Sequence, residues 1–170
     1  LKKINTFLEK KINIRIWVNT WEVIVGSIGD ENFSDYTILW DHVNLASRLE
    51  WINKYYTTRI IISENTFAYV KNNFQIRKLD NIKVKGKENG VKIYEVFHSE
   101  KHLNPDFFVQ HQKALHLYYQ KKFEKALKIF EKNYSLYHDE VAKIFIERIH
   151  QYQKNASLYN PEMIFEFHLK

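Results

Sequence analysis

The 170-residue sequence contains no cysteine, two prolines and four glycines. The absence of cysteine excludes disulfide scaffolds, thiolate metal sites and cysteine nucleophiles together. No apolar run approaches the roughly 18 residues that a membrane span requires, so the sequence predicts no transmembrane helix. Four glycines fall well below the usual share of roughly 7%, whereas tryptophan, a rare residue, is also present four times.

The rest of the composition is typical of a globular domain, with 45% hydrophobic residues and a formal net charge of +6. Of the 26 basic residues 21 are lysine and 5 are arginine, and the lysines are spread along the whole chain. A nucleic-acid-binding domain concentrates its basic residues in one stripe and favours arginine. We therefore expect no nucleic-acid partner.

Residues 1–98 alternate between strand and helix patterns. Apolar residues at every second position over 12–18, followed by a second run over 22–29, predict a β-hairpin around Asn19-Thr20-Trp21. Asp41 stands where a helix N-cap belongs, before a helical pattern that continues to Tyr56. The other elements expected are strands over 36–39, 58–62, 74–79, 82–84 and 91–97 and a helix over 64–71 capped by Ser63.

After His98 the strand patterns stop and three helical patterns follow, over about 106–119, 123–136 and 139–152. Residues 155–160 are expected to form a loop, and 163–169 a short strand or a docking tail. One helical hairpin is less than the roughly three repeats that a free-standing solenoid requires. We therefore expect these helices to pack on the preceding domain or on a second copy of the chain.

Several separated motifs carry a family resemblance. The stretch 14–50 contains DYT at 35–37 and VNLASRLE at 43–50, and it is followed by ISENTF at 62–67 and VKGKENGVKIYEV at 84–96. In this order they resemble the C-terminal half of the class III adenylate/guanylate cyclase catalytic domain. The segment ALHLYYQKKFEKALKIFEKN at 114–133 resembles a tetratricopeptide-like helical hairpin.

The resemblance implies an α/β fold class, the C-terminal half of the ferredoxin-like α+β sandwich of cyclases, with an all-α C-terminal helical extension. It implies four parts: the cyclase half at 1–98, a linker at 99–105, the helical hairpin with its third helix at 106–154, and a tail at 155–170. We expect this portion to be cytoplasmic; the sequence leaves open whether a longer parent protein is membrane-anchored.

The resemblance also assigns site residues. Asn44 and Arg48 match the family's transition-state pair, and their i, i+4 spacing places both on one helix face. Lys85 matches the lysine that contacts the triphosphate, and Thr37 matches a position that helps to read the purine and favours ATP over GTP. Read without the family, an Asn-x3-Arg pair on a helix is more often solvated surface.

The resemblance places the two metal-binding aspartates of the family in an N-terminal half that this sequence lacks. Mg²⁺ or Mn²⁺ is therefore expected in the full-length parent, with no ligands in this chain. We interpret Asp35 as a loop residue and Asp41 as an N-cap rather than as a metal pair. Family sites are shared between two subunits, so a homodimer is expected, and the fragment alone is expected to be inactive.

Two classes of function remain open. One is a fragment of an adenylate cyclase that converts ATP to cyclic AMP and pyrophosphate in signal transduction. The other is a non-catalytic cyclase-like domain that dimerises or senses nucleotide, with a helical tail that binds a protein partner. The histidines favour neither, because His98 and His102 lack an obvious third metal ligand, and His111 and His116 are expected on the surface.

The four tryptophans, Trp17, Trp21, Trp40 and Trp51, each stand where cyclases usually have glycine. Trp21 in particular is predicted in a tight turn that requires a positive φ. One interpretation is a degenerate cyclase whose turns are blocked by indole rings. We favour the other, in which UGA codons are read as glycine in the source organism; the codons at these four positions distinguish the two.

Overall fold

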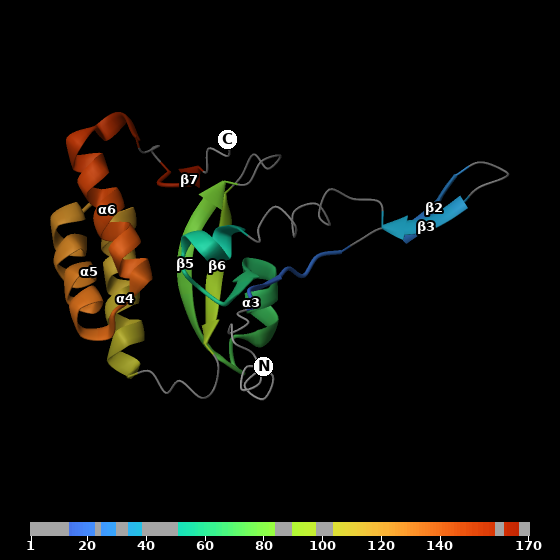
Figure 1. Ribbon diagram of the computed structural model, residues 1–170, viewed down its shortest axis with the longest axis horizontal. Coiled ribbons are helices and arrows are strands. Elements are labelled where there is room, and N and C mark those ends of the chain that lie inside the picture. The colour runs from blue at the N-terminus through green and yellow to red at the C-terminus, as the bar shows by residue number, and fades with distance from the viewer. Residues whose placement is uncertain are drawn as a thin grey trace, which may run out of the picture.

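A computed structural model of the chain describes residues 14–22, 25–29, 34–38, 51–83, 90–97, 104–158 and 162–166. It combines a five-stranded sheet, a separate two-stranded ribbon and several helices (Figure 1). The mixed α and β class predicted from the sequence is confirmed. None of the helices in the described ranges is long and apolar enough to cross a membrane.

The main sheet has the strand order β1-β4-β6-β5-β7. Its strands are β1 (Ile16–Val18), β4 (Ile60–Ser63), β5 (Gln75–Lys83), β6 (Val91–Phe97) and β7 (Phe165–Glu166). The pairs β1–β4 and β5–β7 are parallel, and β4–β6 and β5–β6 are antiparallel. Helix α3 (Glu64–Val70) follows β4 directly, with Ser63 as its N-cap.

The hairpin expected over 12–29 is wrong. Strand β1 pairs with β4 in the main sheet, whereas β2 (Val25–Gly29) pairs with β3 (Ser34–Ile38) in the separate ribbon. Residues 19–22 have no turn structure, and the φ of Trp21 is not positive. The chain leaves β1 for a different sheet, so no tight turn is needed there. Asp35, expected in a loop, lies in β3.

Strand β5 also differs from expectation, because the two strands predicted over 74–79 and 82–84 are one strand of nine residues. A β-bulge interrupts its pairing with β6 between Lys78 and Asp80. In a regular strand, residues three apart point to opposite faces. The bulge shifts this alternation, so that both Arg77 and Asp80 are buried on the side of the helical extension.

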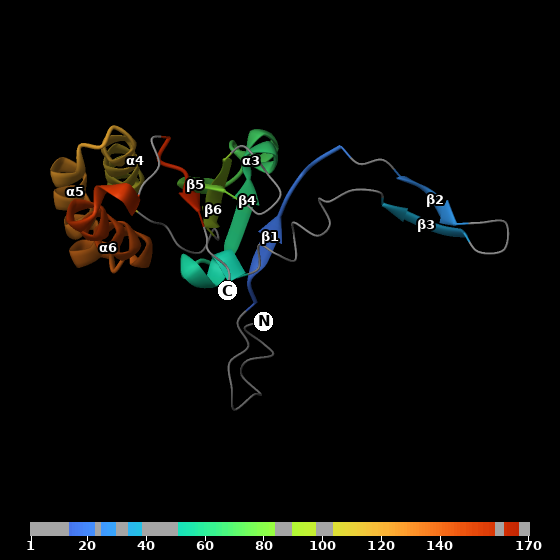
Figure 2. The same ribbon diagram turned by 90° about the horizontal axis from the view of Figure 1, so that it is seen from above.

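The helical extension consists of α4 (Pro105–Tyr119), α5 (Phe123–Tyr137) and α6 (Glu140–Lys154), close to the predicted bounds. Asn104 and Asp139 cap α4 and α6 through their side chains. A short 3₁₀-helix (Ala156–Leu158) follows α6. Figures 1 and 2 show the three helices on one side of the sheet, beside β5, and α3 on the other side.

Sheet and extension share one hydrophobic core. It joins Ile61, Leu79, Ile82 and Ile93 of the sheet to the inner faces of α4, α5 and α6. Its helical members are Ala114, Leu115, Tyr118, Ala126, Phe130, Val141, Ala142, Phe145, Ile149 and Tyr152. The expectation that the helices pack on the preceding domain is therefore confirmed.

Candidate active site

Of the four predicted site residues, only Thr37 lies in a described element. It is in β3, opposite Gly26 of β2. Asn44, Arg48 and Lys85 lie outside the described residues, as does Asp41. The described part of the chain therefore brings no two of the predicted site side chains together, and their roles stay predictions.

The structure does describe the C-terminal end of the helix predicted to carry Asn44 and Arg48. Residues 51–55 are helical, and Thr57 ends the helix with a φ of 54°. The Asn53 amide donates hydrogen bonds to the carbonyls of Ile16 and Arg59, at 3.2 and 3.1 Å. These bonds fix the helix end against the start of β1 and the segment before β4.

A buried carboxylate, Asp80, lies where this helix end meets β5 and the helical extension. Its Oδ2 accepts hydrogen bonds from the Tyr56 hydroxyl at 2.6 Å and from Arg148 Nη1 at 2.6 Å. Its Oδ1 accepts one from the Tyr119 hydroxyl at 2.9 Å. We call these four residues, Tyr56, Asp80, Tyr119 and Arg148, the Asp80 junction.

Burial and neighbouring charges shift the pKa values of Tyr56 and Arg148 in the junction. Burial, and then the charge of Asp80, raises the pKa of Tyr56 well above its ordinary value, so its hydroxyl stays protonated. Burial alone would lower the pKa of Arg148, but the charge of Asp80 and the neighbouring tyrosines together outweigh burial and raise that pKa. The guanidinium is therefore charged, and it stacks on the Phe165 ring at 3.6 Å.

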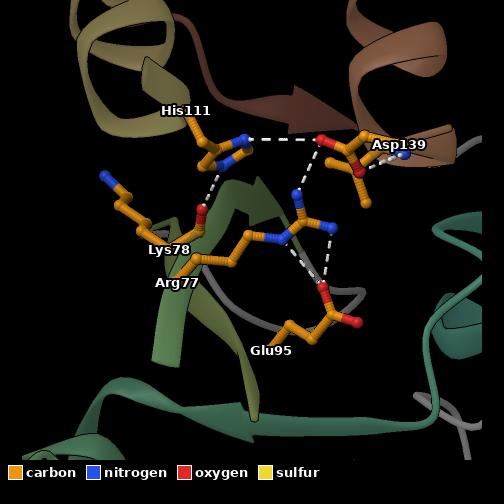
Figure 3. Close-up of polar contacts among 6 residues, drawn as sticks. Arg77, Lys78, Glu95, His111 and Asp139 are labelled. Carbon is orange, nitrogen blue, oxygen red and sulfur yellow. Dashed lines mark hydrogen bonds and ion pairs between the residues drawn. The ribbon is translucent and has the colours of Figure 1, made fainter. Parts of the chain in front are cut away.

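A second buried cluster surrounds Arg77, which directly precedes the bulge in β5 (Figure 3). Arg77 Nη1 donates to Asp139 Oδ2 at 2.7 Å, and its Nε donates to Glu95 Oε2 at 2.8 Å. The guanidinium also lies 4.9 Å from the centre of the Phe107 ring. Burial would raise the pKa of Asp139, but the charge and hydrogen bond of Arg77, with further contributions from His111 and the Val141 N–H, together outweigh burial and lower that pKa.

His111 belongs to this second cluster, and its predicted place on the surface is wrong. Its side chain is 1% exposed, because α4 turns this position toward β5. Nε2 donates to the Lys78 carbonyl at 2.8 Å, and Nδ1 lies 4.0 Å from Asp139 Oδ2. Burial, and then the charge of Arg77, lowers the pKa of His111 to about 4, so the ring is neutral.

The described residues do not fit a divalent metal ion. They contain no group of three or more histidine, aspartate or glutamate side chains that could hold one. Their two most buried aspartates, Asp80 and Asp139, are each paired with an arginine.

The tryptophans occupy different environments. Trp17 and Trp51 are half-buried against the hydrophobic core, whereas Trp21 is 51% exposed. Trp40 lies outside the described residues. A surface groove between residues 20–22 and α3 is lined by Thr20, Trp21, Glu22, Asn65, Ala68 and Tyr69.

Sequence reasoning missed the buried charged residues of both clusters. Arg148 lies in the apolar stripe of α6, between Phe145, Ile149 and Tyr152. A charged residue in such a stripe predicts a buried partner of opposite charge, because arginine is almost never fully buried without a partner. The partners could not be identified, because the sequence gives no sign of the bulge that turns Asp80 inward.

Three comparisons bear on the family of the chain. The sequence model of the adenylate and guanylate cyclase catalytic domain matches residues 1–98. The chain is 33% identical over 153 residues to the terminal-differentiation-specific adenylate cyclase of Dictyostelium discoideum, covering 85% of this chain and 7% of that protein. It is 39% identical over 82 residues to adenylate cyclase 1 of Rhizobium meliloti, covering 48% of this chain and 12% of that protein.

Among solved structures, the adenylyl cyclase CyaB from P. aeruginosa aligns with a TM-score of 0.45 and 34% identity, over 61% of this chain and 52% of that one. The chain thus spans a small part of its curated relatives and about half of that structure. The likeness to the Dictyostelium protein covers more of the chain than residues 1–98, and so includes part of the helical extension. Because the family match covers more than half of the 170 residues, the chain belongs to the family of adenylate and guanylate cyclase catalytic domains.

Proposed function

We propose that this chain supplies the ribose, transition-state and triphosphate contacts of an active site that converts ATP to cyclic AMP and pyrophosphate. The observation that carries the proposal is the family match over residues 1–98, which contains Asn44 and Arg48 at i, i+4 on a predicted helix. The curated relatives are named adenylate cyclases. The activity belongs to the complete protein, of which this chain is one part.

In this reaction the 3′ hydroxyl oxygen of ATP attacks the α-phosphorus, and the bond from that phosphorus to the pyrophosphate oxygen breaks. Charge develops on the phosphate oxygens in the transition state, so fixed donors accelerate the step. Arg48 is proposed to present its planar guanidinium to the reacting phosphate, and Asn44 to hold the ribose in the bent conformation. Lys85 is proposed to bind the triphosphate, and Thr37 to contact the adenine.

Two further partners follow from the family resemblance. Mg²⁺ or Mn²⁺ would neutralise phosphate charge in the parent protein, and its ligands are expected outside this chain. A second copy of the chain is proposed to complete the site, because family sites are built across a dimer interface. The protein partner proposed for the helical tail would have to bind its outer face, since the inner face is buried against the sheet.

A non-catalytic nucleotide-sensing domain is the second candidate. The observation that favours it is the presence of indole rings at four positions where cyclases usually have glycine. Such a domain would bind ATP without releasing pyrophosphate. An assay of cyclic AMP and pyrophosphate formation by the complete protein therefore distinguishes the two candidates.

The test is the substitution Arg48→Ala in the complete protein, with cyclic AMP and pyrophosphate formation as readouts. Loss of a transition-state donor is expected to lower kcat by about 100-fold or more. Arg59→Ala is the matched control, because Arg59 is an exposed arginine beyond the same helix. Equal activity of the two variants would contradict the proposal, and a wild-type protein that binds ATP without turnover would support the second candidate.

A further inference from the structure

We propose that Tyr56 is a positioning residue for the cyclase reaction, and that the helical extension acts on the active site through it. In this inference, which rests on the proposed function, Asp80 and Arg148 hold the Tyr56 hydroxyl. They thereby fix the end of the helix predicted to carry Asn44 and Arg48.

The Asp80 junction joins four elements of the chain. Tyr56 comes from the helix end, Asp80 from the bulge of β5, and Tyr119 and Arg148 from α4 and α6. Tyr56 is 0% exposed, Asp80 0% and Arg148 3%. Because these three side chains are shielded from solvent, each hydrogen bond restricts the geometry more than a surface contact would.

Only one donor to Asp80 comes from the helix end. The Tyr56 hydroxyl donates at 2.6 Å, and it also accepts from Arg148 Nη2 at 3.3 Å. Two further side-chain donors, Arg148 and Tyr119, belong to the extension, and the Asn81 backbone N–H of β5 donates to Asp80 Oδ1 at 2.8 Å. Within the junction, the polar link between the helix end and the extension therefore passes through the Tyr56 hydroxyl.

The predicted helix carries this restraint toward the reacting groups. Arg48 and Tyr56 are eight residues apart, which is about 12 Å along a continuous helix. If the predicted helix is continuous from Arg48 to Tyr56, a shift of its described end would displace the side chain predicted at its other end. A displacement of about 1 Å of a reacting group can cost on the order of 100-fold in rate.

Strand β5 also connects the Asp80 junction to the proposed triphosphate contact. It ends at Lys83, two residues before the proposed triphosphate contact Lys85. Strand β7 pairs with its last residues, Ile82 with Phe165 and Lys83 with Glu166. Arg148, which bonds Asp80, also stacks on Phe165. The same arginine thus braces the helix end and the final part of β5.

The experiment compares Tyr56→Phe with Tyr119→Phe in the complete protein. Each substitution removes one hydroxyl that donates to Asp80 and leaves the ring in place, but Tyr119 belongs to the extension and not to the helix end. We expect Tyr56→Phe to lower kcat by about tenfold or more with the KM for ATP changed by less than about twofold. Tyr119→Phe is expected to keep the wild-type kcat.

Amide hydrogen exchange provides a readout that does not depend on turnover. Exchange of the amides of residues 51–56 is expected to be faster in Tyr56→Phe than in Tyr119→Phe, at equal global stability. Equal kcat values in the two variants, or equal exchange over 51–56, would overturn the inference. A wild-type complete protein without cyclase activity would instead overturn the proposed function, and the positioning role with it.

Discussion

At the scale of single residues, two buried charged side chains of the sheet pair with side chains of opposite charge in the helical extension. Strand β5 presents an arginine and then an aspartate, and α6 meets them with Asp139 and Arg148. A buried ion pair adds little net stability compared with apolar packing, but removing one partner costs about 3–5 kcal/mol. A shift of α6 along β5 would leave these charges unpaired, so the two pairs favour one register of docking.

His111 gives a prediction on pH. Its pKa is about 4 in the folded protein and near 6.5 when unfolded, so below pH 6.5 the unfolded chain binds a proton that the folded chain does not. The free energy of unfolding should therefore fall as the pH is lowered from about 7.5 to about 5, by about 2 kcal/mol from this residue. His111→Gln should lose that contribution, as measured by urea unfolding at both pH values.

His116→Gln is the matched control for this prediction, because His116 lies on the same helix but is exposed. Its pH dependence should follow that of the wild type. If His111→Gln also follows the wild type, then His111 is not the group that responds to acid.

At the scale of elements, the short C-terminal strand has a structural role larger than its two residues suggest. Met163, just before β7, is 3% exposed and belongs to the shared hydrophobic core. Its φ of 55° shows that the packing of the side chain outweighs the conformational cost of the backbone. Strand β7 then covers the edge of β5 that would otherwise be open.

Met163→Ala is expected to lower the free energy of unfolding by about 2–5 kcal/mol, because it leaves a cavity in the core. Alanine and methionine have similar backbone preferences at positive φ, so the change measures packing. Leu158→Ala is the control, since Leu158 is 57% exposed and should change stability by less than about 0.5 kcal/mol. Equal effects in thermal or urea unfolding would show that the segment before β7 is not part of the core.

At the scale of the whole molecule, the described sheet and helical extension are organised around one shared core. The predicted parts 1–98, 106–154 and 155–170 all contribute side chains to this core. Their division into separate parts, with a linker at 99–105, stays a prediction from the sequence. The tetratricopeptide-like character of the extension likewise stays a prediction. Its inner face contacts β5 and is not available to another protein.

A shared core predicts cooperative unfolding, and protein made with the printed sequence, tryptophan included, has two independent probes. All four tryptophans lie between residues 17 and 51, whereas the three long helices lie between residues 105 and 154. Urea unfolding of the chain followed by tryptophan fluorescence and by far-ultraviolet circular dichroism should give the same midpoint. A later midpoint for the helical signal would mean that the extension folds on its own.

Local sequence patterns predicted what depends on local physics. The three helices of the extension have near-predicted bounds, because their apolar residues recur with the helical period and Asn104 and Asp139 are good caps. The partners of β1 and the continuity of β5 were wrong, because strand pairing and bulges are set by residues distant in the sequence. The expected exposure of His111 failed for the same reason.

The order of the motifs was enough to assign the cyclase family. It also nominated the candidate site residues Thr37, Asn44, Arg48 and Lys85, because short motifs in a fixed order are recognisable without the tertiary structure. The partners of Arg77, Asp80, His111 and Arg148 emerged only in three dimensions. Their burial depends on a bulge in β5 and on the docking of α4 and α6, and no local pattern encodes a contact between residues 68 positions apart, such as Asp80 and Arg148.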